Sequence, residues 1–209
     1  MKKILLTIAC VGFLTTNIFA QAIESESPVL PSTTTINPIV GMTFSIMTAE
    51  PAGYTSEVEA GWHAGAMMRT GDKIFFQPGV EISQIGLSLQ SSGTDYMTDV
   101  THLRIPLAAG VRLIGDGRPS ETTFNIDVHG GISADILLAV NERNNMLSKN
   151  DFNSPLISAL GGIAVDYEFL TLGVDYSIGL TDAFAEGSVL QSKAKSNSFF
   201  VTLGGNFPF

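Results

Sequence analysis

The sequence predicts an all-β fold, an eight-stranded antiparallel up-and-down transmembrane β-barrel, and three observations lead to this prediction. Segments in which apolar and polar residues alternate recur along the chain, which is the pattern of strands with one apolar face. The connections between these segments are short and long in turn, as in barrels of bacterial outer membranes. Beyond the N-terminal region, no segment approaches the roughly 18 uninterrupted apolar residues of a membrane helix, although 44% of the residues are hydrophobic.

The chain begins with the pattern of a secretory signal peptide, which we place at residues 1–20. Two lysines precede an apolar stretch, and small residues follow it at Ala20 and Ala22, so that cleavage after either alanine fits. Cys10, the only cysteine, lies in this segment. The mature chain is therefore expected to have neither a disulfide nor thiol chemistry.

The charge of the chain argues against nucleic acid as a partner. The full chain has 11 Lys and Arg, 20 Asp and Glu, and a formal net charge of −9. Removal of Lys2 and Lys3 with the signal peptide leaves 9 basic residues against 20 acidic ones, which is a charge of −11. Proteins bind nucleic acids through cationic surfaces, and such a composition does not favour one.

The mature chain divides into a lead-in and a barrel. Residues 21–36 are acidic and then rich in Ser, Thr and Pro, and we expect them to form a flexible lead-in. Residues 37–209 hold eight alternating segments and are expected to form the barrel. The expected strands are 37–48, 57–69, 73–89, 97–113, 121–139, 154–168, 170–181 and 196–209.

Turn residues bound each expected strand. The first ends at "TAEPAGYTS", "TGDK" separates the second from the third, "SSGTDY" follows the third, and "GDGRPSE" follows the fourth. The fifth ends at "NERNNMLSKNDFN", the sixth and seventh meet at the turn within "YEFLTL", and "DAFAEGSVLQSKAKSN" precedes the last. Short turns at one end of the barrel and mostly longer loops at the other are therefore expected.

The two-residue period is clear in most strands and slips in one. In the seventh strand, Leu172, Val174 and Tyr176 share a face, opposite Gly173 and Asp175. In the third strand the apolar phase slips near residue 84, where we expect a β-bulge.

The polar faces are expected to point into the lumen and the apolar faces outward. Many glycines fall on the polar faces, and the interior of an eight-stranded barrel is just wide enough for its own side chains, so small residues there relieve crowding. Aromatic residues on the apolar faces gather at the strand ends beside the short turns, where rings form an interfacial girdle. The expected girdle consists of Phe76, Phe124, Tyr167, Phe169, Phe207 and Phe209.

Ionisable residues on the polar faces are expected to plug the lumen, because charges in a narrow, low-dielectric lumen must pair or hold water. We expect Asp127 beside Arg112 across a short turn, and Asp166 close to Asp175. The expected network consists of Glu81, His102, Arg104, Arg112, Asp127, His129, Asp166 and Asp175, and the other inward groups are Glu57, Glu59, His63, Asp135 and Glu168.

The three histidines indicate neither catalysis nor a metal site. No serine is fixed by spacing to His63, His102 or His129, whereas catalysis needs a base within about 3 Å of a nucleophile. No HxH or HxxxH pair offers neighbouring metal ligands. We expect no enzyme activity, no cofactor and no bound metal.

The chain resembles the PorT-like outer-membrane β-barrel domain family, small eight-stranded barrels of Gram-negative bacteria. The stretches "QPGVEIS" (77–83) and "LRIPL" (103–107) and the aromatic terminus "FFVTLGGNFPF" carry the resemblance, which covers most of residues 37–209. It implies an integral outer-membrane protein whose last strand is similar to the signal read by the barrel-assembly machinery. Because the family includes secretion-apparatus members and others with no known role, the resemblance implies an architecture more than an activity.

The expected function is a structural or surface-interaction role in the outer membrane. The expected partners are outer-membrane lipid, the barrel-assembly machinery, and surface or secretion proteins that contact the two longest loops. Two alternatives remain open in the membrane, a narrow pore and a component of a secretion apparatus. A third is a soluble periplasmic lipocalin-like barrel, in which the same alternation would place the apolar face inside.

Overall fold

The computed structural model describes residues 34–48, 55–91, 94–115, 124–143, 147–185, 188 and 194–208. The expected signal peptide, residues 21–33 of the expected lead-in, and Phe209 lie outside the described residues. The first strand begins at Thr34, slightly before the expected start of the barrel at residue 37.

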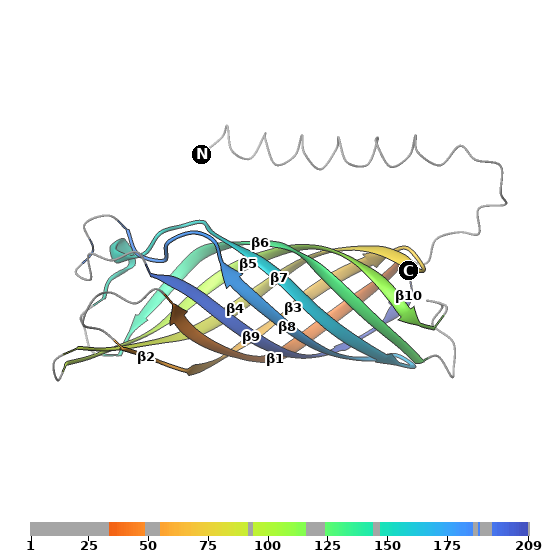
Figure 1. The fold of residues 1–209 in the computed structure, drawn as a ribbon, viewed down its shortest axis with the longest axis horizontal. Helices are drawn as coiled ribbons and strands as arrows, with labels where there is room; N and C mark the ends of the chain where they lie inside the picture. The colour runs from red at the N-terminus through yellow and green to blue at the C-terminus, as the bar shows by residue number, and fades with distance from the viewer. Residues whose placement is uncertain are drawn as a thin grey trace, which may run out of the picture. The chain divides into compact units, whose positions relative to one another are not determined.

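The described strands form a closed antiparallel barrel (Figure 1). Each strand pairs with its neighbour from β1 and β3 through to β9, and the pairing of β1 with β9 closes the cylinder. β2 continues the line of β3 along β4, and β10 continues the line of β9 along β1, so eight strand lines surround the lumen. The predicted eight-stranded up-and-down barrel is confirmed. The elements are β1 (Thr34–Thr48), β2 (Thr55–Glu57), β3 (Glu59–Thr70), β4 (Ile74–Ser91), β5 (Thr94–Ile114), β6 (Phe124–Glu142), η1 (Lys149–Asp151), β7 (Leu156–Tyr167), β8 (Leu170–Gly179), β9 (Lys195–Gly205) and β10 (Phe207–Pro208).

The hairpin turns between β3 and β4 and between β7 and β8 lie at one end of the barrel, which we call the turn end (right in Figure 1). Gly71 in the first turn has a φ of 117°, and Glu168 in the second has a φ of 54°; both lie in the left-handed region that tight hairpins use. The opposite end, which carries η1, we call the loop end. No helix among the described residues is both long and apolar enough to cross a membrane.

One connection at the loop end is shorter than predicted. The sequence predicts a loop at "SSGTDY", but pairing of β4 with β5 continues to Ser91 and Thr94, which leaves only residues 92–93 between the strands. Both strands are long: β5 has 21 residues and is the longest described strand, and β4 has 18. The hairpin therefore projects as paired strand where a loop was expected.

Side chains alternate between the lumen and the outer surface along each strand, as the two-residue period requires. In β8, Leu172, Val174 and Tyr176 are exposed on the outside, whereas Thr171 and Ser177 are buried in the lumen. The same arrangement of apolar side chains outside and mainly polar side chains inside holds over the turn-end half of the barrel, where Phe75 is a large apolar side chain that lies inside.

Glycines make room for two of the large lumen groups. Gly41 faces His63 in the β1–β3 register, and a Cβ there would lie 2.1 Å from the Val201 carbonyl oxygen and 2.4 Å from the imidazole. Gly162 faces Asp175, and a Cβ there would lie 2.1 Å from Oδ1 of that carboxylate. All three distances are far below van der Waals contact, so a larger residue at either position would displace its neighbours.

The bulge predicted near Gln84 is wrong. The β4–β5 register runs without a shift from Ile74 to Ser91, and the same faces of β4 point inward throughout. The apolar phase slips because the lumen itself becomes apolar toward the loop end, where Ile85, Leu87 and Leu89 follow Glu81 and Ser83 on the inward face. Register shifts occur in the β5–β6 pair and beside Val58, where the pairing of β2 with β4 is offset by one residue from that of β3 with β4.

Candidate functional site

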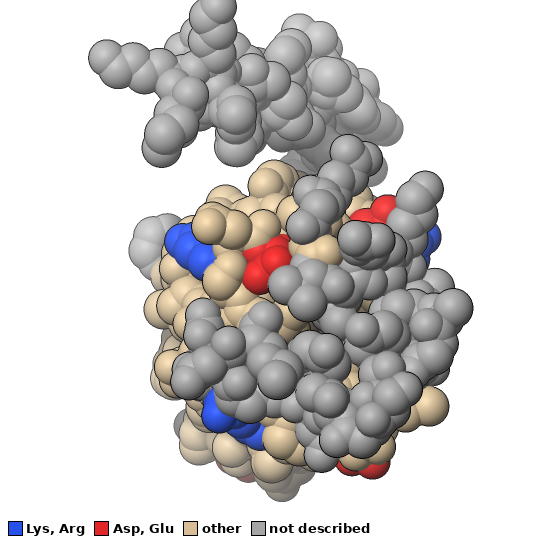
Figure 2. Space-filling model, turned by 90° about the vertical axis from the view of Figure 1, so that its left-hand side faces the viewer, with Lys and Arg blue, Asp and Glu red and all other residues tan. Residues whose placement is uncertain are grey.

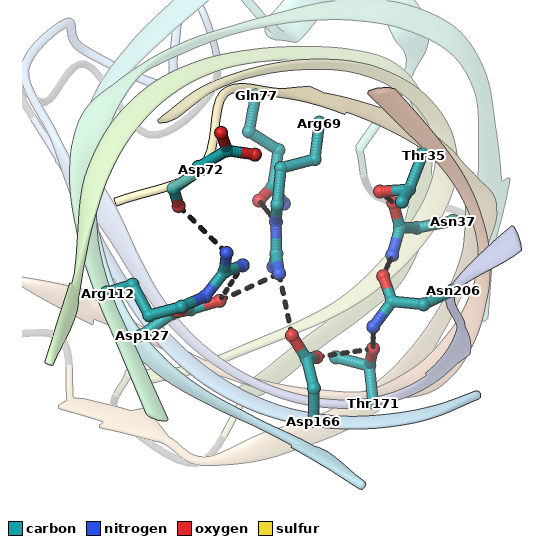
Figure 3. Close-up of polar contacts among 10 residues, drawn as sticks. All are labelled: Thr35, Asn37, Arg69, Asp72, Gln77, Arg112, Asp127, Asp166, Thr171 and Asn206. Atoms are coloured by element: carbon teal, nitrogen blue, oxygen red, sulfur yellow. Dashed lines mark hydrogen bonds and ion pairs between the residues drawn. The ribbon is translucent and has the colours of Figure 1, made fainter. Parts of the chain in front are cut away.

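A belt of polar side chains crosses the lumen at the turn end (Figure 3). All of its members point inward, and each of the eight strand lines contributes at least one. We call it the polar belt; it consists of Thr35, Asn37, Arg69, Gln77, Arg112, Asp127, Asp166, Thr171 and Asn206.

Arg69 of β3 is the centre of the polar belt. Its Nη1 donates to Oδ2 of Asp127 at 2.7 Å and to Oδ2 of Asp166 at 2.8 Å, and its Nε donates to Oε1 of Gln77 at 3.0 Å. The guanidinium carbon lies 4.7 Å from the ring centroid of Phe75, which is close enough for a cation–π contact. Because the side chain of Arg69 is only 5% exposed, its charge depends on these partners.

Arg112 supplies the second positive charge of the belt. Its Nε donates to Oδ1 of Asp127 at 2.9 Å, and its Nη1 donates to the carbonyl oxygen of Asp72 at 2.8 Å. Two guanidinium groups therefore face the two carboxylates of Asp127 and Asp166, and the charges balance. Charges removed from water are tolerated when they are both paired and hydrogen-bonded, as they are here.

The remaining members form a chain of hydrogen bonds that extends to the seam where β1 pairs with β9 and β10. Thr171 donates from Oγ1 to Oδ1 of Asp166 at 2.7 Å and accepts from Nδ2 of Asn206 at 2.8 Å. Asn37 donates from Nδ2 to Oδ1 of Asn206, and Thr35 donates to Oδ1 of Asn37 at 3.0 Å. The belt thus links side chains of β1 and the β9–β10 connection across the closure of the barrel.

The middle of the lumen is polar but less completely paired. Nε2 of His129 and Oδ1 of Asp175 are 2.5 Å apart, and Nε2 of His63 is 3.0 Å from Oγ1 of Thr202. Arg104 lies over the ring of Phe200 at 4.0 Å, and its Nε is 3.9 Å from Oδ1 of Asp135, which is too far for a hydrogen bond.

Two small cavities of about 40 and 30 Å³ occupy this middle region. Arg104 and Phe200 line both of them. Each is large enough for about one or two water molecules. Nδ1 of His102 and Nε of Arg104 have no hydrogen-bond partner among the described residues, and water is the partner that such buried groups need.

An apolar cluster fills the lumen at the loop end. The loops fold inward so that Phe152 and Phe184 pack with ring centroids 5.4 Å apart, and their backbones form an isolated β-bridge. The members from the strands are Met47, Ile85, Leu87, Leu89, Val100 and Leu137, and those from the loops are Leu147, Phe152, Ala183, Phe184 and Ala194. We call this group the apolar cluster.

The eight residues of the expected network all lie on the inward faces, but they do not form one group. Asp127 lies beside Arg112 as expected, whereas Asp166 and Asp175 do not meet. Asp166 binds Arg69 and Thr171. Asp175 lies on β8 two inward positions beyond Thr171, where it pairs with His129. Glu81, His102, Arg104, His129 and Asp175 belong to the middle region, and Arg112, Asp127 and Asp166 to the polar belt.

Three of the other acidic residues expected inside lie elsewhere. Glu57 is exposed on β2, and Glu168 forms part of the β7–β8 turn. Glu59 contacts Arg143 at 3.5 Å near the loop end, where Arg143 also binds Asp99 at 2.6 Å. Arg143 is 44% exposed, and the hydrogen bond that its guanidinium donates to Asp99 raises the pKa of Arg143 above the usual value.

Sequence reasoning missed Arg69, Gln77 and Asn206, as well as the whole apolar cluster. Arg69 has the same inward phase as His63, so continuing the two-residue period to the end of β3 identifies it. No comparable signal marks the apolar cluster, because five of its eleven members come from loops.

The expected girdle residues project outward at the turn end. Phe76, Phe124, Tyr167, Phe169 and Phe207 are all exposed on the outer surface. Phe209, the sixth, lies outside the described residues.

The histidines do not assemble a metal centre in the described part of the chain, where no three His, Cys, Asp or Glu side chains are placed to hold an ion. Ser83 of β4 lies between His63 and His102 in the strand register, a proximity that spacing alone did not reveal. Ser83 is 1% exposed, and its Oγ has no hydrogen bond to any described residue.

Figure 2 looks onto the loop end of the barrel. The described surface is mainly uncharged there, and its basic and acidic residues form small, separate patches of both signs. No continuous cationic face is visible among the described residues, as the negative net charge suggests.

No protein-family model matches the chain, and no curated protein matches it. Among solved structures, the chain is similar to the crystal structure of Ail, the attachment invasion locus protein of Yersinia pestis, in complex with the heparin analogue sucrose octasulfate. The two are 8% identical, with a TM-score of 0.43, and the match covers 85% of this chain and 100% of that one. Membership of the PorT-like family stays a prediction.

Proposed function

We propose that this protein is an integral outer-membrane β-barrel whose lumen is closed and whose loop end is an interaction surface on the cell exterior. The observation that carries the proposal is the outer wall, because every strand line exposes large apolar side chains on it. Soluble monomers rarely expose contiguous apolar patches above a few hundred Å², whereas here the apolar surface continues around the barrel. A lipid bilayer is the solvent that such a surface requires.

The dimensions and charges of the wall support a bilayer location. β7, β8 and β9 have 12, 10 and 11 residues, close to the roughly 9–11 residues of a tilted strand that crosses the hydrocarbon core. Along the described strands, the outward positions in the middle of the wall and toward the turn end carry no Asp, Glu, Lys or Arg, and the outward Asp99 and Lys195 lie near the loop end. The soluble lipocalin-like alternative requires the opposite orientation, with the apolar face inside.

The two layers inside the barrel support a closed lumen. The polar belt occupies the turn end with paired charges, the apolar cluster fills the loop end, and the cavities between them have room for only a few waters. A hydrated ion needs a continuous wet path, which neither layer offers. We therefore propose that the barrel does not conduct ions.

The loops that cover the apolar cluster are the proposed binding surface. Phe152 and Phe184 anchor the described parts of these loops in the barrel mouth, where an isolated β-bridge joins their backbones. A preformed surface loses less conformational entropy when a partner binds. The proposed partners are surface or secretion proteins outside the cell envelope, and the barrel-assembly machinery would act on the C-terminal strand during insertion.

We also propose that the barrel is not an enzyme. Ser83, the serine placed between two histidines, is buried in the lumen beneath the apolar cluster, and no hydrogen bond activates it in the described part of the chain. A nucleophile needs an adjacent base and access to its substrate.

The orientation is tested with single-cysteine variants, because the only natural cysteine lies in the expected signal peptide. Asn150→Cys places a thiol in η1 at the loop end, and Lys73→Cys places one at the turn end; both residues are exposed. A maleimide attached to a polymer too large to cross the outer membrane should label Asn150→Cys in intact cells, and Lys73→Cys only after permeabilisation. The opposite pattern contradicts the proposed orientation.

The closed lumen is tested by planar-bilayer recording of the purified, folded chain. The proposal predicts no current steps above those of protein-free bilayers. Reproducible unitary steps would contradict a closed lumen and favour the narrow-pore alternative. Removal of the polar belt's central group in Arg69→Ala provides a comparison in which the lumen is locally widened.

A further inference from the structure

An open groove of about 600 Å³ lies at the loop end on the side of β7, β8 and β9. Residues 153–155 form one wall, residues 180–182 form the other, and Lys195 of β9 lies beside them. Its volume is within the range of about 300–1,000 Å³ that is usual for small-molecule sites. It is far larger than either cavity inside the barrel.

Hydrogen bonds hold the two walls of this groove in place. Nδ2 of Asn153 donates to the carbonyl oxygens of Asp182 at 3.0 Å and Phe184 at 2.7 Å, and the Asn153 backbone N–H donates to the Ala183 carbonyl at 2.9 Å. Oγ1 of Thr181 accepts from the Ile157 N–H at 2.9 Å. The groove is therefore preformed by the fold of the loops.

The charged groups of the groove are available to a ligand. Neither the ammonium of Lys195 nor the carboxylate of Asp182 forms an ion pair with any described residue. An ammonium binds phosphate oxygens as a compact point charge. A carboxylate accepts hydrogen bonds from hydroxyl groups, such as those of a sugar.

The groove lies directly above the apolar wall. Lys195 and Leu180 occupy outward positions at the loop ends of neighbouring strands, and Ile178, Tyr176 and Phe199 continue the same outward face toward the turn end. A ligand with its polar part in the groove would therefore lay any acyl chains along this wall.

We propose that this groove binds the phosphorylated sugar headgroup of a glycolipid in the outer leaflet, with Lys195 on a phosphate and Asp182 on a sugar hydroxyl. Lys195 would bind a phosphate, Asp182 would accept from a hydroxyl, and the apolar face below the groove would contact acyl chains. The expected ligand therefore has all three groups. This inference rests on the proposed membrane location. A lipid bound in the groove would fix how deeply the barrel sits in the membrane and would hold the loops that line the groove in place.

The test uses the purified full-length barrel, folded in detergent and titrated by native mass spectrometry. The probes are an acylated glucosamine disaccharide with two phosphates, its dephosphorylated form, phosphatidic acid, and inorganic phosphate. The variants are Lys195→Gln, Asp182→Asn, and Lys73→Gln, an equal charge change at the turn end. Gels of unheated and boiled samples verify that each variant is a folded barrel, so a failure of the fold is distinguished from a failure of binding.

The expected result is one phosphorylated glycolipid per barrel, with affinity lowered roughly tenfold or more by Lys195→Gln and unchanged by Lys73→Gln. Asp182→Asn should weaken binding of the glycolipid without affecting that of phosphatidic acid, which has no sugar hydroxyl. Unchanged affinity in Lys195→Gln, or equal binding of the dephosphorylated lipid, would overturn the proposal. Equal affinity for phosphatidic acid would show a general anionic-lipid contact, and displacement by inorganic phosphate would show a free-phosphate site; either result also overturns the proposal.

Discussion

Replacement of Arg69 by methionine is expected to be the most destabilising single change in the lumen that keeps side-chain volume. Arg69 makes three side-chain hydrogen bonds, two of them to carboxylates. In Arg69→Met, Asp127 keeps Arg112, but Asp166 keeps only the hydroxyl of Thr171. A buried charge thus loses its only counterion among the described residues.

The expected loss follows from the burial of this pair. Removing one partner of a buried ion pair costs about 3–5 kcal/mol, because the remaining charge is stranded. The double variant Arg69→Met/Asp166→Asn removes the stranded charge and is expected to be more stable than Arg69→Met alone. Arg143→Met is the matched control, since Arg143 also contacts two carboxylates but is 44% exposed. Exposed pairs contribute about 0–1 kcal/mol.

The assay is equilibrium unfolding in urea of the barrel folded into lipid vesicles. Trp62, the only tryptophan, projects from the outer wall and reports the transfer between lipid and water by its fluorescence. Loss of less than about 1 kcal/mol in Arg69→Met, or an equal loss in Arg143→Met, would refute the view that the polar belt stabilises the barrel. A double variant less stable than Arg69→Met would refute the stranded-charge explanation.

Three other predictions concern the wall, the apolar cluster and the seam. Val174→Arg, in the middle of the outward face of β8, should cost about 2–4 kcal/mol in vesicles; an unchanged urea midpoint would contradict burial of this position in lipid. Leu89→Ala should cost about 2–5 kcal/mol in the same assay because it opens a cavity in the apolar cluster, and near-wild-type stability would show that the cluster is loosely packed. Gly41→Val should lower the yield of folded barrel on unheated gels, since a Cβ would lie 2.1 Å from the Val201 carbonyl. Gly161→Val is the control that should fold normally, because a Cβ at this outward glycine would come no closer than 3.8 Å to another residue.

The wall of the barrel was predictable because its signal is local. Alternation such as that of Leu172, Val174 and Tyr176 fixes which face is outside, and turn residues such as Gly71 fix where strands reverse. The pairing of Arg112 with Asp127 was predictable for the same reason, because the two positions face each other across adjacent strands.

The contents of the lumen were less predictable because they depend on residues distant in sequence. Arg69 joins Asp127 and Asp166 across the width of the barrel, a contact that neither spacing nor register between neighbours specifies. Ile85, Leu87 and Leu89 point into the lumen, where they pack with Phe152 and Phe184 of the loops. Because apolar residues were expected only on the outer face, these three were misread as a change in which face of β4 points inward. Long-range packing, and not the local pattern, decides what fills a closed barrel.

The central claim is that the apolar wall faces a bilayer. It is tested most directly by fractionating cells that express the chain, washing the membranes with carbonate, and comparing unheated with boiled samples of the pellet on a gel. The account predicts that the protein stays in the pellet and changes mobility on boiling, as a folded membrane barrel does. Recovery in the soluble fraction without detergent, with the same mobility before and after boiling, would contradict it.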